Sequence, residues 1–237
     1  MYMIEVFGLK FKGINKNAIL SHSNEMKFVV TVNSEFIVEA HKDQSFKDII
    51  NLNYSTFDGQ IPYILAKWKV NAQFEKISGS DLIFDVLKLS SKNRNKVFLL
   101  GDTNEVNQNA VTRARSEFDS DCFGFSPQFE PYPFSKSLNN EIINMISSVR
   151  PYYLFVAFGA KKQEMWINEH REILERLGVK LVVGCGGSIS FLSQKVSRAP
   201  LIVQKMGMEG IYRFIQEPKL FRLKRIFKSF LVFKYIW

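Results

Sequence analysis

Four short apolar runs recur along the chain and predict buried strands, because none shows the alternation of a half-exposed strand. Between them lie longer amphipathic stretches with the three- and four-residue spacing of helices. The predicted strands are Lys27 to Val32, Lys96 to Leu100, Tyr152 to Phe158 and Lys180 to Val183, and the predicted helices are Ser34 to Ile50, Asn104 to Phe118, Leu138 to Val149 and Lys162 to Leu177, with Gly178 as a stop. This alternation predicts a mostly parallel α/β sheet.

The pattern changes after Pro200, beyond which only helices are predicted. We therefore expect a Rossmann-like domain over residues 1–199, with helices flanking its sheet, and a helical C-terminal appendage over residues 200–237. From Pro218 onward the appendage contains no acid but six basic residues, which account for six of the nine net positive charges. They are Lys219, Arg222, Lys224, Arg225, Lys228 and Lys234.

Aromatic and aliphatic residues are interleaved with this charge between Phe221 and Trp237. Such a composition favours contact with an anionic membrane surface, where apolar side chains enter the headgroup boundary and basic side chains meet the lipid charge. The alternative is a C-terminal helix packed on the domain with its lysines in solvent.

Composition narrows the classes of protein further. The two cysteines, Cys122 and Cys185, are too few for a disulfide framework and predict a reducing cytosol. There is no signal-peptide pattern and no run of 18 apolar residues, so we expect neither export nor a membrane span. A net charge of +9 also suits a nucleic-acid-binding module, but no nucleic-acid-binding signature accompanies it.

The densest polar segment, FGAKKQEMWI from Phe158 to Ile167, follows a predicted strand. A glycine turn there would let the backbone approach a ligand, and the next helix would offer N–H groups and lysine charge to a phosphate. An ordinary strand-to-helix turn explains the segment equally well. The candidate substrate-binding residues are Gly159, Lys162, Gln163 and Glu164, with Lys161 as an alternative source of charge.

A second glycine turn follows the strand that ends at Val183. It resembles a phosphate loop, with Gly184, Gly186 and Gly187 as candidate substrate-binding residues, although tight packing is as good an explanation. It is not a dinucleotide fingerprint, because that motif would require glycine in place of Ile189.

Polar residues also end the first strand and a short candidate strand after it. Thr31 and Asn33 close the first, and Asp58 follows Phe57 at the end of the second. An aspartate at the carboxyl end of a strand can act as a general base on a sugar hydroxyl. The alternative is an Asp-Gly turn whose carboxylate caps the next helix.

Metal chemistry has weak support in the sequence. Asp119-Ser120-Asp121 matches the short D-x-D spelling of a cation site, but two acids at that spacing arise easily by chance. The three histidines form no zinc-binding pattern. We therefore expect no metal site.

Seven ordered segments together resemble the WecB/TagA/CpsF family, glycosyltransferase family 26, over most of the chain. They are Val29 to Ala40, Asp58-Gly59, Ser78 to Asp81, Val97 to Gly101, Phe158 to Ile167, Gly184 to Pro200 and Gly207 to Pro218. The combination of K-Q-E-x-W-I with K-V-x-R-A-P is the most specific part of the match.

The resemblance implies an inverting, metal-independent glycosyltransferase without a cofactor. Its donor would be a UDP-sugar carrying N-acetylmannosamine, glucose or a similar sugar. Its acceptor would be a polyprenyl-diphosphate-linked sugar in teichoic acid, capsule or O-antigen synthesis. Because that acceptor lies in the bilayer, the resemblance also implies a cytoplasmic enzyme, peripheral on the inner face of the cell membrane and attached through its tail.

The resemblance also implies roles for individual residues. Asp58 falls on the family's proposed catalytic base, Thr31 and Asn33 on polar crevice residues, and Gln163 on a glutamine associated with the donor. Lys76 stands where the family usually has arginine, which keeps the charge without the bidentate fork. Further departures are Phe57 and Lys161, which replace prolines, and Ser190, which replaces an aspartate.

A tail that closed over the crevice would bring basic residues to the donor diphosphate, and the candidates are Arg213, Arg222 and Arg225. The alternative to an enzyme is a basic membrane- or nucleic-acid-binding module without catalytic activity. We expect no nucleic-acid partner, because the charge lies in a hydrophobic tail. The sequence leaves a homo-oligomer open.

Overall fold

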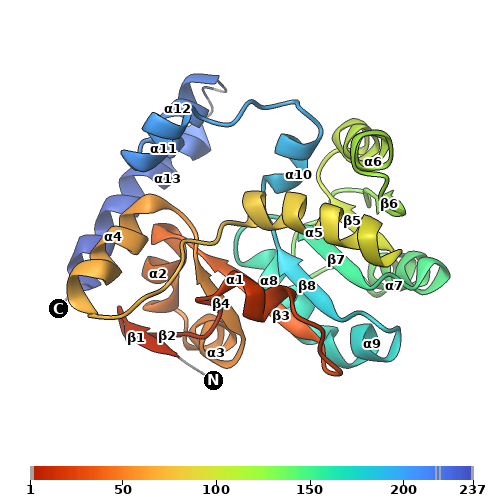
Figure 1. The fold of residues 1–237 in the computed structure, drawn as a ribbon, viewed down its shortest axis with the longest axis horizontal. Coiled ribbons are helices and arrows are strands. Elements are labelled where there is room, and N and C mark those ends of the chain that lie inside the picture. The colour runs from red at the N-terminus through yellow and green to blue at the C-terminus, as the bar shows by residue number, and fades with distance from the viewer. Residues whose placement is uncertain (1–2, 217, 219, 236–237) are drawn as a thin grey trace. The chain divides into compact units, whose positions relative to one another are not determined.

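The computed structural model describes residues 3–216, 218 and 220–235, the side chains of residues 221, 224 and 225 excepted. A six-stranded sheet has the order β4-β3-β8-β7-β5-β6. Every neighbouring pair with a described register is parallel, so the predicted α/β class is confirmed (Figure 1). The strands are β3 (Lys27–Val32), β4 (Tyr54–Phe57), β5 (Val97–Gly101), β6 (Cys122–Phe125), β7 (Tyr153–Ala157) and β8 (Leu181–Gly184).

The chain forms two compact units, each built from segments that are distant in sequence. The first contains residues 1–21, 29–78 and 196–237, and the second contains residues 22–28 and 79–195. The division into residues 1–199 and 200–237 stays a prediction.

The first unit contains β4, most of β3 and a small antiparallel hairpin of β1 (Ile4–Val6) and β2 (Leu9–Phe11). Its core is aromatic. Phe57 of β4 stacks on Phe11 with ring centroids 4.1 Å apart and also contacts Phe74 at 4.9 Å. Its helices are α1 (Lys16–Leu20), α2 (Ser34–Ala40), α3 (Gln44–Leu52), α4 (Gln60–Lys69), α11 (Leu201–Lys205), α12 (Glu209–Gln216), α13 (Leu220–Phe230) and the short 3-10 helix η1 (Leu231–Tyr235).

The second unit holds β5 to β8, of which β5 and β8 are buried along their whole length. Its helices are α5 (Gly79–Asn93), α6 (Asn104–Phe118), α7 (Lys136–Val149), α8 (Lys162–Glu169), α9 (Arg171–Arg176) and α10 (Ser188–Leu192). The helices α5, α6 and α10 contact one another and lie above the strands in Figure 1, while α9 lies below them. Burial on both faces explains why these strands lack polar alternation.

Two long predicted helices are each divided in the structure. The stretch Ser34 to Ile50 forms α2 and α3, because the Asp43 side chain accepts a hydrogen bond from the Phe46 N–H and so caps a new helix. The stretch Lys162 to Leu177 is interrupted at His170, whose Nδ1 lies 2.9 Å from the Trp166 carbonyl oxygen. The hairpin β1–β2 and strand β6 were not predicted.

Candidate active site

The carboxyl ends of β3 and β4 bring the predicted catalytic residues together in the first unit. The register pairs Thr31 with Thr56 and Val32 with Phe57, and the Asp58 N–H continues the ladder by donating to the Val32 carbonyl oxygen at 2.9 Å. Alternate residues of a strand share a face. Thr31, Asn33 and Asp58 therefore belong to the same face of these strands.

Asn33 and Asp58 have different local structural roles. The Asn33 side-chain oxygen caps α2 by accepting from the Phe36 N–H at 3.1 Å. Asp58 is half-buried and is followed by Gly59, whose φ of 97° turns the chain into α4. The turn thus presents a carboxylate just beyond the end of β4.

Lys76 lies beside the same strand end. It forms an isolated parallel bridge with Phe57, and the Ile77 N–H donates to the Phe57 carbonyl oxygen at 3.0 Å. The Thr56 hydroxyl donates to the Ile77 carbonyl oxygen at 2.8 Å on the same edge. The backbone of a cationic residue is therefore held beside Phe57, the residue that precedes Asp58.

In the second unit, the loop between β7 and α8 has an unusual backbone. Gly159 has a φ of 93°, and a Cβ added there would meet no atom within 4 Å, so this turn borders open space. Lys161 has a φ of 69°, a value that no proline can adopt. The backbone at Lys161 is therefore one that a proline at this position would not allow.

Two predicted substrate-binding residues of α8, Gln163 and Glu164, are buried, with exposures of 2% and 0%. The Gln163 Nε2 donates to Glu164 Oε1 at 2.7 Å, and the Gln163 Oε1 accepts from the Gly186 N–H at 3.2 Å. Burial raises the pKa of the Glu164 carboxyl to about 7, against smaller lowering effects of hydrogen bonds from Gln163 and backbone amides. Lys162 begins the same helix, with its Nζ 5.6 Å from the centre of the Phe129 ring.

The glycines of the second turn have different roles. The space that a Cβ at Gly184 would need is filled by Glu164 Oε1 and Gln163 Nε2, so this glycine permits packing. Gly186 has a φ of 51°, and a Cβ added there would meet nothing within 4 Å, which leaves its outer side open to a ligand. The N–H groups of Cys185, Gly186 and Ser188 already donate within the fold, which leaves Gly187 as the candidate amide donor to a ligand.

Asp102 is a candidate site residue that sequence reasoning missed. It follows β5 with a φ of 62°, and its carboxylate accepts from the Thr103 N–H at 2.8 Å and from the Ser190 hydroxyl at 2.6 Å. Burial, followed by the charges of Asp102 and Glu164, raises the pKa of the Cys185 thiol. The Ser190 hydroxyl of α10 thus donates to a carboxylate that follows β5.

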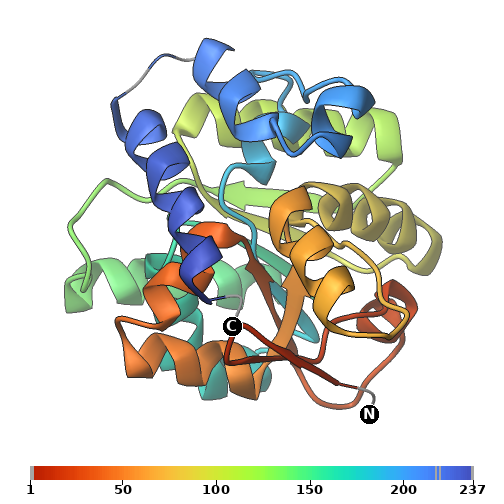
Figure 2. The same ribbon diagram turned by 90° about the vertical axis from the view of Figure 1, so that its left-hand side faces the viewer.

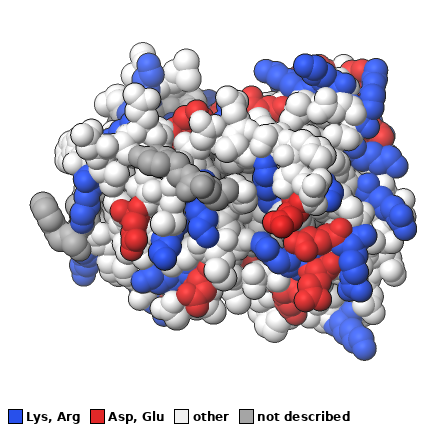
Figure 3. All heavy atoms as spheres, turned by 60° about the horizontal axis from the view of Figure 1, so that its bottom comes forward, with Lys and Arg blue, Asp and Glu red and all other residues white. Residues whose placement is uncertain are grey.

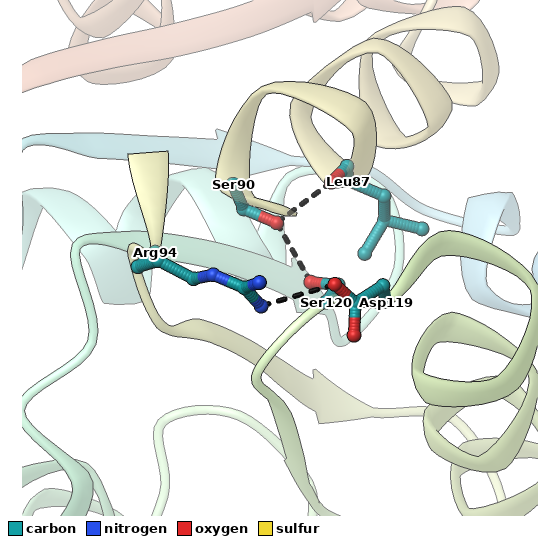
Figure 4. A network of polar contacts seen from close by, with 5 residues as sticks. All are labelled: Leu87, Ser90, Arg94, Asp119 and Ser120. Atoms are coloured by element: carbon teal, nitrogen blue, oxygen red, sulfur yellow. Dashed lines mark hydrogen bonds and ion pairs between the residues drawn. The ribbon is translucent and has the colours of Figure 1, made fainter. Parts of the chain in front are cut away.

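The D-x-D match has a structural explanation (Figure 4). Asp119 ends α6 in the left-handed conformation with a φ of 50° and pairs with Arg94 at 3.0 Å. Between the two acids, the Ser120 hydroxyl is buried against that of Ser90 at 2.7 Å, and Ser90 donates to the Leu87 carbonyl oxygen. The motif closes a helix and joins it to α5.

Within the first unit, α13 and η1 pack against α2 (Figure 2). Lys228 Nζ lies 2.6 Å from Glu39 Oε1 and 3.6 Å from Glu35 Oε1, and Tyr235 stacks on His41 with ring centroids 4.0 Å apart. Arg213 of α12 and Arg222 of α13 are half-buried on contacting helices, whereas the side chain of Arg225 lies outside the described residues. Lys219 and Trp237 of the predicted tail also lie outside them.

Much of the apolar surface of the appendage stays exposed. Phe227 and Phe230 are 65% and 54% exposed, and Leu201, Ile202, Met206, Ile215 and Leu220 are exposed as well. No helix in the described part of the chain has the length and apolar character needed to cross a bilayer.

Comparisons with known proteins show which sequences the chain is similar to. A model of the glycosyl transferase WecG/TagA/CpsF family matches residues 4–237. An N-acetylglucosaminyldiphosphoundecaprenol N-acetyl-beta-D-mannosaminyltransferase of Staphylococcus aureus strain MRSA252 is 30% identical over 214 residues, or 89% of this chain and 81% of the relative. A protein of the same name from strain MW2 is 30% identical over 222 residues, or 93% and 83%.

Proposed function

Because the chain belongs to the WecG/TagA/CpsF family of glycosyltransferases, we propose that it moves a sugar from a UDP-sugar to a polyprenyl-diphosphate-linked sugar. The names of the relatives specify an N-acetylmannosaminyl group and N-acetylglucosaminyldiphosphoundecaprenol. We take both as the first donor sugar and acceptor to test. The observation that carries the proposal is the pairing of β3 with β4, which brings Asp58 to the strand ends that carry Thr31 and Asn33, in a chain that matches the family model over residues 4–237.

Asp58 is the proposed general base. Its carboxylate would take the proton of the acceptor hydroxyl as that oxygen forms a bond to the anomeric carbon of the donor. The bond between the anomeric carbon and the diphosphate oxygen breaks on the opposite face, and its electron pair leaves with UDP. A single displacement of this kind inverts the anomeric configuration.

The departing diphosphate needs positive charge or hydrogen-bond donors around it. Within the second unit, open space beside Gly159 and Gly186 supports close approach of a phosphate to the backbone, with Gly187 and Lys162 as further contacts. Within the first unit, Lys76, Arg213 and Arg222 are the cationic candidates. We propose that cationic side chains and backbone amides, rather than a divalent cation, neutralise the leaving group.

The transfer reaction is tested by product formation from a panel of UDP-sugars with a synthetic polyprenyl-diphosphate-linked N-acetylglucosamine in excess chelator. We expect one donor to be consumed only when acceptor is present, with inversion at the anomeric carbon. Turnover that depends on a divalent cation would contradict the metal-independent mechanism. Absence of acceptor-dependent turnover with every donor would contradict the proposed reaction.

We also propose that the appendage holds the enzyme on the inner face of the cell membrane. Its exposed Phe227 and Phe230 support this, because aromatic side chains next to basic residues suit an anionic headgroup region. Nucleic acid is a poorer partner for this charge. On the face drawn in Figure 3, basic and acidic side chains are interspersed instead of forming a basic stripe.

Flotation with anionic liposomes tests the membrane proposal. We expect the wild-type chain to float and the double variant Phe227→Ser/Phe230→Ser to lose most of its binding, while Leu52→Ser, a change of an exposed residue of α3, floats like wild type. Equal flotation of all three proteins would contradict a role for these aromatic residues. Binding to DNA but not to liposomes would favour the nucleic-acid alternative.

A further inference from the structure

Gln163 and Glu164 form a buried polar pair at the first turn of α8. Their side chains join through the 2.7 Å hydrogen bond from Gln163 Nε2 to Glu164 Oε1. Glu164 Oε1 is the acceptor of this hydrogen bond, whereas an amide has one accepting end and one donating end. Glu164 therefore determines which end of the Gln163 amide turns away from it.

The end that turns away is the carbonyl oxygen, which accepts from the Gly186 N–H. With the opposite amide orientation, an NH2 group would face this N–H and the hydrogen bond would be lost. The three residues thus form one chain of contacts from Glu164, through Gln163, to the backbone of the glycine turn.

This chain of contacts has little room to rearrange. Glu164 Oε1 and Gln163 Nε2 fill the space that a side chain at Gly184 would occupy. The pair therefore packs against Gly184, and Gln163 also accepts the hydrogen bond from the Gly186 N–H. Interiors packed this closely pass a change at one residue to its neighbours.

The fold keeps Glu164 at a cost to stability. Its side chain is fully buried, and among the described residues Oε2 has no hydrogen-bond partner. Burial of a carboxyl with an unpaired oxygen is unfavourable. An apolar residue at this position would avoid that free-energy cost. This cost is a reason to look for a local role of Glu164.

We propose that Glu164 is a positioning residue, which orients the Gln163 amide and through it fixes the Gly184–Gly187 turn for the nucleotide donor. The inference rests on the proposed function, because that function makes the turn part of the donor site. Gln163 then acts on the donor through the backbone of the turn.

Amide exchange at Gly186, followed by NMR in the full chain without donor, tests the positioning step directly. We expect exchange to accelerate at least tenfold in Glu164→Ala and to return close to wild type in Glu164→Gln, whose amide oxygen can accept the same hydrogen bond. Glu175→Ala, a change at an exposed residue of α9, is the matched control. If Glu164→Ala does not fold, Glu164→Asp carries the same expectation, because its shorter carboxylate cannot reach Gln163.

Steady-state kinetics on the same variants test the consequence for the donor. We expect Glu164→Ala to raise the donor KM about tenfold with the acceptor KM unchanged, and Glu164→Gln to restore it. Unchanged Gly186 exchange in Glu164→Ala, or no rescue by Glu164→Gln, would overturn the inference. A wild-type chain that transfers no sugar would instead refute the proposed function, since the exchange measurement needs no activity.

Discussion

Glu164 is a fully buried carboxyl whose pKa is raised from 4.5 to about 7 by its removal from water. The folded state therefore binds a proton more tightly than the unfolded state does. Proton binding by Glu164 therefore stabilises the folded state. This stabilisation is fully present below pH 4.5 and is lost as the pH rises through 7. A difference of this size is worth on the order of 3 kcal/mol.

We expect the variant Glu164→Gln to remove that pH dependence, because its neutral amide keeps the hydrogen bond to Gln163 without a buried charge. The urea unfolding midpoint of wild type should fall between pH 5 and pH 8 by more than that of the variant. Glu175→Gln serves as the control for a change at an exposed glutamate. Parallel pH profiles for wild type and Glu164→Gln would contradict the raised pKa.

Gly184 and Gly186 should respond differently to an added methyl group. Gly184→Ala drives a Cβ into Glu164 and Gln163, and we expect a loss of about 1–3 kcal/mol in the free energy of unfolding. Gly186→Ala meets open space and carries only the smaller cost of its positive φ. Chemical denaturation of both variants tests this order, and a more stable Gly184→Ala would refute the packing role.

These glycines show what residue-level prediction could and could not supply. The turn was predicted from its glycines. A glycine that permits packing and a glycine that permits ligand approach look the same in the sequence, and only the atoms around each Cα distinguish the two roles. Asp102 was missed because its role depends on a positive φ and on Ser190, 88 residues away in the chain. Local sequence contains neither.

Element boundaries were predictable where a local cap coincides with the end of an apolar pattern. Helix α6 spans Asn104–Phe118 as predicted, because Thr103 caps its start and Asp119 ends it in the left-handed conformation. The division between α2 and α3 was missed, since the apolar spacing continues across the cap at Asp43. The order of the strands is set by contacts distant in sequence, so local periodicity could not give it.

The docking of α13 on α2 should depend on Lys228. Its ion pairs with Glu35 and Glu39 join side chains that are all less than one-third exposed, and such pairs contribute about 0.5–1 kcal/mol. We expect Lys228→Gln to speed amide exchange across α13, measured by mass spectrometry. Lys205→Gln, a change in exposed α11, should have no such effect, and equal exchange in both variants would contradict the role of these ion pairs.

For the molecule as a whole, the appendage combines two properties that the sequence presented as alternatives. One face of it packs on α2 through Lys228 and Tyr235, and another leaves Phe227 and Phe230 in contact with solvent. Packing on the protein and the proposed contact with lipid therefore use different residues of the same segment. The membrane role stays a proposal, which the liposome comparison tests.

The central claim is that Asp58 is the base of a sugar transfer from a UDP-sugar. The most direct test is the turnover of Asp58→Asn beside Asp121→Asn, a change at an exposed aspartate of the second unit, with UDP affinity measured by calorimetry. Loss of a general base lowers the reaction rate about 100- to 10,000-fold. We predict that Asp58→Asn loses turnover in this range while it still binds UDP and Asp121→Asn stays near wild type; turnover of Asp58→Asn within a few-fold of wild type would contradict the account.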